Sequence, residues 1–263
     1  MPLADFLGAW VLFPSQSTYE GTGAPQAGTY TILAQLRDPD GLTMHTAWSI
    51  EPGRTMVAEH RAVVGGHAVS LPTHPDMSSR TWFADGSLNS EVHLDGVLIH
   101  RTTRTLNDDV LVVDEALSGA QGAVAMHSVY KRARVKQVLV YRRDLKMRKG
   151  KIAAQTAHAS MAVLLQRSVG TEETLEIPVR GPMAWWLQRG FAKVVLSVED
   201  EEALMMVHAE AKRRGIPTAL ITDSGRTEFA GVATRTAVAI GPDVASVIDA
   251  ITGPEGLVQT KLA

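Results

Sequence analysis

Residues 135–159 read VKQVLVYRRDLKMRKGKIAAQTAHA and mark a change in the character of the chain. Within them, Val138–Tyr141 is an apolar run typical of a short buried strand. A charged loop at 142–150 follows, and the segment Lys151–Arg167 is rich in alanine and leucine, which favours a helix. A strand, a loop and a helix in succession indicate an α/β domain.

The same alternation continues downstream. Strands are predicted at 193–197, 218–222 and 235–240, and helices at 182–189, 199–214 and 241–251. Gly190 and Gly215 end two of these helices, as glycine commonly does just after a helix. We therefore expect a three-layer α/β domain at 135–263, with a mixed sheet of about four strands.

Residues 1–134 are instead typical of antiparallel β-structure. The alternating runs Thr29–Leu36 and Leu42–Ile50 are separated by the turn sequence Asp38–Gly41. Further turn sequences recur at 65–66, 85–86, 95–96, 107–109 and 118–119. This regular spacing predicts an all-β module, either an up-and-down barrel or a sandwich.

Two short motifs in this half resemble those of known barrels. Gly8-Ala9-Trp10 resembles the Gly-x-Trp of the first strand in lipocalin-like barrels, and Val129-Tyr130-Lys131-Arg132 is similar to the last strand of fatty-acid-binding barrels. The resemblance implies a lipocalin-like module that can hold a small apolar ligand. A tryptophan that closes one barrel end as part of the core explains the motif without a ligand, and we prefer that interpretation.

Composition limits the class of protein. The 263 residues are 45% hydrophobic and 21% charged, which suits two globular domains. The chain has no cysteine, so disulfides, thiolate metal ligands and a cysteine nucleophile are excluded, and we expect a reducing cytoplasm. Residues 1–13 lack the basic start of a signal peptide, and no apolar run is long enough to span a membrane.

The net charge of −2 conceals an asymmetry between the two halves. Residues 1–134 contain 9 Lys and Arg against 14 Asp and Glu, a net −5, whereas 135–263 contain 17 against 14, a net +3. The loop 142–151 holds much of the positive charge, opposed within it only by Asp144. Such clusters suit phosphate contacts, although charge runs are generally solvated faces.

Three ordered blocks carry a specific resemblance. The first holds Arg142–Met147, Gly150-Lys151, Ala153-Ala154-Gln155 and His158-Ala159; the second is Asp223–Thr227; the third is Thr236 with Ala239–Pro242. In this order they resemble the type 2 peptidyl-tRNA hydrolases. The sequence departs from the family pattern at Arg148 and Ser224, and by one extra residue between Thr227 and Thr236.

The resemblance implies hydrolysis of the ester bond between peptide and tRNA in peptidyl-tRNA, without a cofactor. Catalysis is assigned to Lys151, Asp223, Thr227 and Thr236. Substrate binding is assigned to Arg142, Arg143, Arg148, Lys149, Gln155 and Arg226. The family is dimeric, so a homodimer through the C-terminal domain is also implied.

The chemistry of ester hydrolysis agrees with this assignment. A water must be positioned and deprotonated, and negative charge on the carbonyl oxygen must be stabilised. Asp223 can act as the general base or orient the water, and the sequence leaves both roles open. Lys151, near a helix N-terminus, can neutralise the oxyanion or bind the terminal phosphate. Thr227 and Thr236 supply hydroxyls that can hold water or ribose.

Other interpretations remain for single residues and for the whole chain. His158 shares a helix face with Lys151 and Gln155, and we interpret it as a structural core histidine rather than a catalytic one. No His-x-x-x-His pair supports a metal site. Two rival functions are a tRNA-binding protein without turnover and a small-molecule-binding barrel with an accessory hydrolase domain.

Overall fold

The computed structural model describes residues 2–21, 23–51, 54–71, 74–119 and 122–263. Its contacts divide the chain into two compact units, residues 1–133 and residues 134–263. Each unit has its own sheet and its own hydrophobic core. Among the described residues, no helix combines the length and the apolar character needed to cross a membrane.

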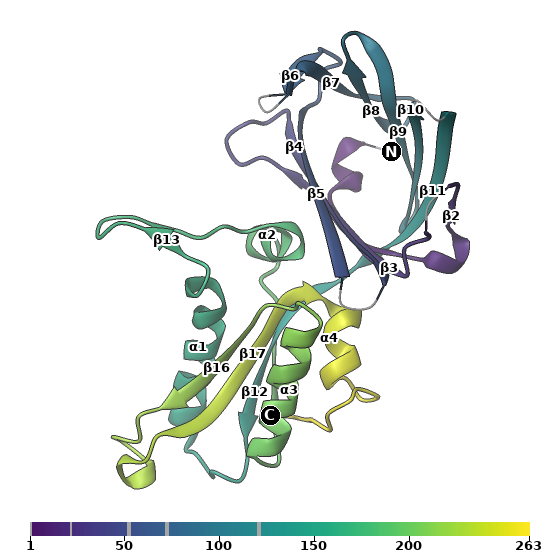
Figure 1. Cartoon of the computed structure of the whole chain (residues 1–263). Helices are drawn as coiled ribbons and strands as arrows, with labels where there is room; N and C mark the ends of the chain where they lie inside the picture. The colour runs from purple at the N-terminus through teal and green to yellow at the C-terminus, as the bar shows by residue number, and fades with distance from the viewer. Residues whose placement is uncertain (1, 22, 52–53, 72–73, 120–121) are drawn as a thin grey trace. The chain divides into compact units, whose positions relative to one another are not determined.

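The described part of unit 1 is a single curled antiparallel sheet (Figure 1). Its strand order is β5-β4-β3-β1-β11-β10-β9-β8-β7-β6, with β2 beside β11. The strands are β1 (Gly8–Leu12), β2 (Thr18–Tyr19), β3 (Ala27–Ala34), β4 (Gly41–Glu51), β5 (Arg54–Val63), β6 (Val69–Leu71), β7 (His74–Ala84), β8 (Ser87–Leu94), β9 (Val97–Asn107), β10 (Val110–Gly119) and β11 (Gly122–Ala133). A bridge between Val64 and Thr81 ties the chain after β5 to β7, which curls the sheet toward closure.

The predicted turns at 85–86, 95–96 and 107–109 are confirmed as hairpin turns between neighbouring strands, whereas 65–66 joins β5 and β6, which do not pair with each other, and 118–119 belongs to the end of β10. Asp85, Asp95 and Asp108 each adopt positive φ, from 49° to 52°, beside their turn glycine or aspartate. Short polar residues tolerate this left-handed conformation, and it matches the twist of hairpin strands. These turns join β7 to β8, β8 to β9 and β9 to β10.

Buried side chains that alternate along the strands form the hydrophobic core of unit 1. Trp10 is fully buried and donates its indole N–H to the carbonyl of Phe6, at 3.2 Å. Phe6 lies in a short 3-10 helix, η1 (Leu3–Phe6), and packs with Ile32 and Leu111 in the same cluster. The expected core role of the Gly-x-Trp tryptophan is confirmed.

Unit 2 contains a five-stranded mixed sheet in the order β16-β17-β12-β15-β18. Its strands are β12 (Val135–Arg142), β15 (Lys193–Val198), β16 (Thr218–Asp223), β17 (Thr234–Val244) and the short β18 (Lys261–Leu262). Strands β12 and β15 are parallel, and the other pairs are antiparallel. A separate hairpin joins β13 (Val169–Gly170) to β14 (Leu175–Glu176).

Helices cover both faces of this sheet, which gives the three expected layers (Figure 1). They are α1 (Lys149–Leu165), α2 (Gly181–Gln188), α3 (Glu201–Arg213) and α4 (Ala245–Thr252). Because successive strand residues point to opposite faces, Leu139 packs with α1 and α2, whereas Val138 and Val140 pack with α3 and α4. Asp200 caps α3 by accepting a hydrogen bond from the N–H of Ala203, at 2.9 Å.

One predicted boundary is wrong. Gly241-Pro242-Asp243 were expected to start the last helix, but β17 runs through them to Val244 and α4 begins at Ala245. The N–H of Gly241 donates to the carbonyl of Pro217, at 2.8 Å, which keeps this segment extended. Gly241 has φ of 81°, and a Cβ there would lie 2.7 Å from the side chain of Ile248, so glycine is required.

Candidate active site

Four polar side chains from three elements of unit 2 meet at one edge of its sheet. Asp223 is the last residue of β16, Thr236 lies near the start of β17, and Lys151 and Gln155 lie on the first two turns of α1. Hydrogen bonds link all four. This is the edge where β16 ends and α1 begins in Figure 1. Residues that are more than 70 positions apart in sequence are therefore brought into one cluster.

The ion pair of Lys151 and Asp223 is the centre of the cluster. Lys151 Nζ lies 2.6 Å from Asp223 Oδ2, and the two side chains are only 11% and 13% exposed. The hydrogen bond from Lys151 is the main influence that holds the pKa of Asp223 below its usual value. Asp223 is thus a carboxylate at neutral pH.

Both oxygens of the Asp223 carboxylate accept further hydrogen bonds. Oδ2 also accepts from Gln155 Nε2, at 2.9 Å, and Oδ1 accepts from the backbone N–H of Gly225, at 2.8 Å. Gly225 has φ of 78°, and a Cβ there would lie 2.5 Å from the carbonyl oxygen of Val232. The glycine of the second sequence block is therefore needed to bring its N–H to the carboxylate.

Thr236 orients Gln155 and is fully buried. Its hydroxyl donates to Gln155 Oε1, at 2.6 Å, so that the amide nitrogen of Gln155 faces Asp223. The exposed fraction of Thr236 is 0%. Because β17 places this hydroxyl beneath Gln155 and out of solvent, it does not face a position that a ribose could occupy.

Thr227 lies on the open side of the cluster. Its hydroxyl accepts a hydrogen bond from Lys151 Nζ, at 3.0 Å, and the residue is exposed. The ring of Phe229 lies 5.7 Å from the same ammonium, within cation-π range. Lys151 thus uses two of its three N–H donors on described residues, which leaves one for an oxygen of a substrate.

The prediction that Arg142 contacts the substrate is wrong. Its guanidinium is buried and forms ion pairs with Asp144 and Glu201, each at 2.6 Å, and it also donates to the carbonyl of Arg235. The hydrogen bond with Asp144 raises the pKa of Arg142 and lowers that of Asp144. Arg142 therefore joins the end of β12 to α3 and β17.

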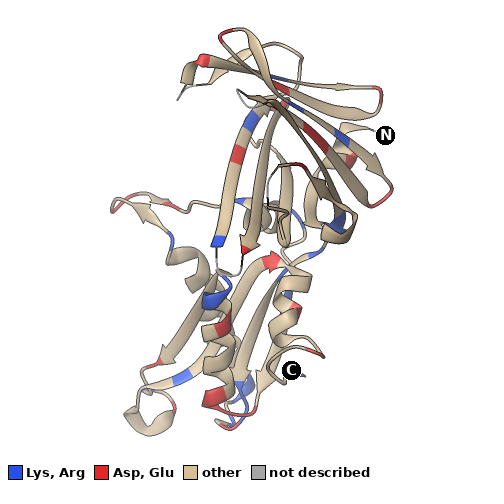
Figure 2. Ribbon diagram, turned by 45° about the vertical axis from the view of Figure 1, so that its right-hand side comes forward, with Lys and Arg blue, Asp and Glu red and all other residues tan. Residues whose placement is uncertain are grey.

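The other expected substrate-binding cations lie on the surface. Arg143 pairs with Glu199 at 3.1 Å, and Arg148 pairs with Glu228 at 2.9 Å, while Lys149 and Arg226 are exposed. Acidic and basic residues alternate on the ribbon at this edge of the domain (Figure 2). Ion pairs in which the arginine is solvent-exposed are weak, so these guanidinium groups are held only loosely.

His158 is not a core residue. It lies on α1 but is exposed, whereas Gln155 and Ala159 on the same helix are buried. The alanines at 154 and 157 are also exposed, so they do not indicate tight packing. The interpretation of His158 as a buried structural histidine is therefore wrong.

Two contributors to the site were missed in the sequence. Phe229 approaches Lys151, and Glu228, whose side chain is 18% exposed, pairs with Arg148. Both directly follow Thr227, so their adjacency to the second block was the available signal. Phe229 and the next residue, Ala230, adopt positive φ of 68° and 51°, which turns the chain back toward the site.

Unit 2 is thus an α/β domain in which a lysine–carboxylate pair, held by the amide of Gln155, lies at the edge of the sheet. The model of the family "Peptidyl-tRNA hydrolase PTH2" matches residues 135–255. The peptidyl-tRNA hydrolase of Methanopyrus kandleri is 42% identical over 118 residues, which cover 45% of this chain and 93% of that protein. The chain belongs to the peptidyl-tRNA hydrolase PTH2 family through these residues.

Two further relatives show the same pattern. The peptidyl-tRNA hydrolase of Thermococcus onnurineus is 39% identical over 120 residues, covering 46% of this chain and 94% of that protein. The human mitochondrial peptidyl-tRNA hydrolase 2 is 41% identical over 118 residues, covering 45% of this chain and 61% of that protein. All three similarities span less than half of this chain.

Solved structures match the other half. The fluorescent protein UnaG is 19% identical, with a TM-score of 0.36, and the match covers 50% of this chain and 100% of that one. The Echinococcus granulosus fatty-acid-binding protein 1 is 12% identical, with a TM-score of 0.35 and the same coverage.

Proposed function

We propose that unit 2 hydrolyses the ester bond between peptide and tRNA in peptidyl-tRNA, releasing free tRNA and peptide. The observation that carries this proposal is the linked cluster of Lys151, Asp223, Gln155 and Thr236 in a domain of the PTH2 family. Relatives of about 40% identity to this domain are peptidyl-tRNA hydrolases by name.

The geometry favours an orienting role for Asp223 over that of a strong general base. An efficient base has a pKa near the operating pH, whereas Lys151 holds the pKa of Asp223 below its ordinary value. The carboxylate can still accept a hydrogen bond from the attacking water and align it. Its negative charge also holds the Lys151 ammonium in place, at 2.6 Å.

Lys151 is the proposed electrostatic catalyst. Its ammonium is mostly buried, lies at the N-terminal end of α1 and has one N–H directed to no described residue. A carbonyl oxygen that gains negative charge beside it would be stabilised in a setting where water screens little. Thr227 and Phe229 then form the rim against which the substrate rests.

Substrate affinity is assigned to the exposed cations around the cluster. Arg143, Arg148, Lys149 and Arg226 can neutralise tRNA phosphates without reading sequence, which suits an enzyme that accepts every tRNA. Arg142 is left out because its guanidinium is occupied. We propose a cytoplasmic activity that needs no cofactor, in agreement with the absence of cysteine from the sequence.

A homodimer through unit 2 is also part of this proposal. Met161 and Leu165 lie one turn apart on α1 and are 51% and 43% exposed, and Leu187 on α2 is 38% exposed. Exposed apolar groups on neighbouring helices are common at subunit contacts. Light scattering on the purified chain measures the mass directly, and a monomer at all concentrations would rule out this part.

The test of the activity is release of an N-acetylated amino acid from its tRNA by the full chain. Lys151→Met and Asp223→Asn should each remove most of the turnover, whereas Lys212→Met, an exposed control on α3, should keep it. If the full chain binds tRNA but shows no turnover, the proposed activity is refuted and the rival function, a tRNA-binding protein without catalysis, is supported.

A further inference from the structure

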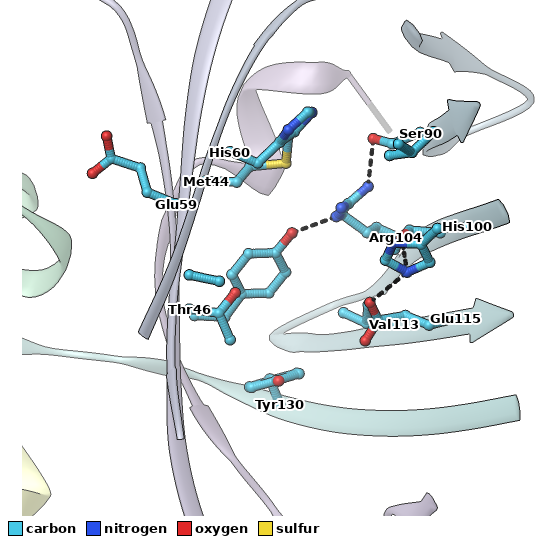
Figure 3. A pocket seen from close by; sticks show the side chains of 14 residues that line it. Met44, Thr46, Glu59, His60, Ser90, His100, Arg104, Val113, Glu115 and Tyr130 are labelled. Atoms are coloured by element: carbon cyan, nitrogen blue, oxygen red, sulfur yellow. Dashed lines mark hydrogen bonds and ion pairs between the residues drawn. The ribbon is translucent and has the colours of Figure 1, made fainter. Parts of the chain in front are cut away.

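The curled sheet of unit 1 encloses a cavity of about 200 Å³ (Figure 3). Its walls come from strands on both sides of the sheet, β3, β4 and β5 on one and β8, β9, β10 and β11 on the other. The polar groups that matter below are Tyr30, His60, Ser90, His100, Arg104 and Glu115. The volume is below the range of about 300–1,000 Å³ that holds drug-sized ligands, so an occupant must be small.

Arg104 is a buried cation on the wall of this cavity, with only neutral hydrogen-bond partners. It is 5% exposed, and its guanidinium donates to Tyr30 Oη at 2.5 Å and to Ser90 Oγ at 3.0 Å (Figure 3). In the part of the chain that the structure describes, Arg104 forms no ion pair. A buried charge without a counter-charge is costly, so an anion that entered the cavity would be bound strongly.

Arg142 shows how this chain treats a buried arginine that has a structural role. Arg142 is 8% exposed and has two carboxylate partners, Asp144 and Glu201. On the outer face of β9, Arg101 similarly pairs with the buried Glu91, at 2.6 Å. The inward-facing Arg104, on the same strand as Arg101, departs from both examples.

The two acidic side chains on the cavity wall already have partners, and one of these partners, His100, also lines the cavity. Glu115 accepts from His100 Nε2, at 3.1 Å, and Glu59 pairs with Arg61, at 3.2 Å. The negative charge of these carboxylates disfavours a ligand that carries more than one negative charge. A singly charged anion therefore suits the cavity better than a dianion such as phosphate.

His60 provides an additional polar contact without adding positive charge. Its Nε2 is buried and has no hydrogen-bond partner among the described residues. Burial is the main cause that lowers the pKa of His60 to about 4, helped by the charge of Arg104, so the ring is neutral near pH 7. A neutral imidazole can donate a hydrogen bond to an anion or accept one from a neutral group.

We infer that this cavity binds a small organic carboxylate, with the carboxylate on Arg104 and the apolar part against Met44, Val92 and Val113. The guanidinium offers N–H donors in a planar fork that matches a carboxylate. The side chains of Met44 and Val113 lie on opposite walls around Arg104 (Figure 3). The occupant is thus amphiphilic, and not the purely apolar ligand that the barrel resemblance allows.

The test uses the full chain and a series of carboxylates of about four to ten carbons, both linear and aromatic, each paired with its primary amide. Titration calorimetry near pH 7 should show binding of at least one carboxylate and much weaker binding of its amide. Arg104→Met should weaken that binding by about 30-fold or more, the effect of removing one partner of a buried ion pair. Arg101→Met, on the outer face of the same strand, should bind like the unaltered chain.

Folding is checked by circular dichroism and by a melting curve without ligand. A ligand-binding role predicts that Arg104→Met melts no lower than the unaltered chain, and that the bound carboxylate raises the melting temperature of the unaltered chain only. If Arg104→Met unfolds, Arg104→Lys must retain part of the affinity and Tyr30→Phe must reduce it. Absence of binding by the whole series, equal binding of acid and amide, or binding of inorganic phosphate alone would each overturn the inference.

Discussion

Thr236→Val is the sharpest test of how the site is built, because this buried threonine would influence the proposed catalysis by orienting Gln155. The change keeps the shape of the side chain and removes the hydroxyl that donates to Gln155 Oε1 at 2.6 Å. The amide of Gln155 is then held from one side only, by its bond to Asp223. Rotation of the amide would present its oxygen to the carboxylate and loosen the pair with Lys151.

The expected magnitude follows from these contacts. A buried amide oxygen left without a donor costs about 1–3 kcal/mol of folding free energy. If the transition state relies on the placement of Asp223 and Lys151, its stabilisation should fall by on the order of 1.4 kcal/mol, which lowers kcat about tenfold. Affinity for tRNA should stay the same, because Thr236 is fully buried.

The assay is release of N-acetylated amino acid from tRNA at saturating substrate, together with denaturant unfolding of the same variants. Thr236→Ser restores the hydroxyl and should restore most of kcat. Thr234→Val is the matched control on β17, since the hydroxyl of Thr234 bonds, among the residues that the structure describes, only to the carbonyl of Val232. An unchanged kcat in Thr236→Val, or a serine variant as slow as the valine one, would refute the positioning role.

Three further predictions follow from the same structure. Asp223→Ala should lower kcat by about 100-fold or more with little change in tRNA affinity, and unaltered turnover would show that the assignment is wrong. Replacing Arg148 or Lys149 by Ala should weaken binding of every tRNA alike and reduce the slope of log affinity against log salt by about one unit or less. Arg142→Ala should instead destabilise unit 2 by about 1–3 kcal/mol, since its partners are part-exposed. If Arg142→Ala altered only tRNA binding and the surface variants altered only stability, this division would be contradicted. Residues 134–263 expressed alone should fold and hydrolyse the ester, and a folded but inactive fragment would count against placing the whole site in unit 2.

The pH dependence of unit 2 has a defined sign. The pKa of Asp223 is lower in the folded protein than its ordinary value of 3.8, chiefly because Lys151 bonds to it. The stability that this carboxylate contributes is therefore complete above about pH 4 and is lost as the pH falls through the folded pKa. Denaturant unfolding followed by circular dichroism at a series of acidic pH values measures this loss of stability. Asp223→Asn has no carboxylate at this position and should lack this part of the pH dependence.

Local sequence determined the elements and the composition of the catalytic cluster. Apolar alternation and turn residues placed the hairpins of unit 1, because side-chain direction in a strand depends only on position along it. The ordered blocks identified Lys151, Gln155, Asp223, Thr227 and Thr236, and the structure brings them together. Strand ends and helix starts in an α/β domain meet at one sheet edge, so this grouping could be anticipated.

Only the tertiary structure decided what each of these side chains can reach. Arg142 and Arg143 are neighbours in sequence, yet Arg142 is enclosed by Glu201, 59 residues away, while Arg143 remains on the surface. The burial of Thr236 and the exposure of His158 likewise depend on how β17 and α1 pack. In unit 1, Arg101 and Arg104 lie on one strand, and the curl of the sheet places only Arg104 in the cavity. Burial and charge compensation arise from contacts between distant segments, which the order of residues along the chain does not specify.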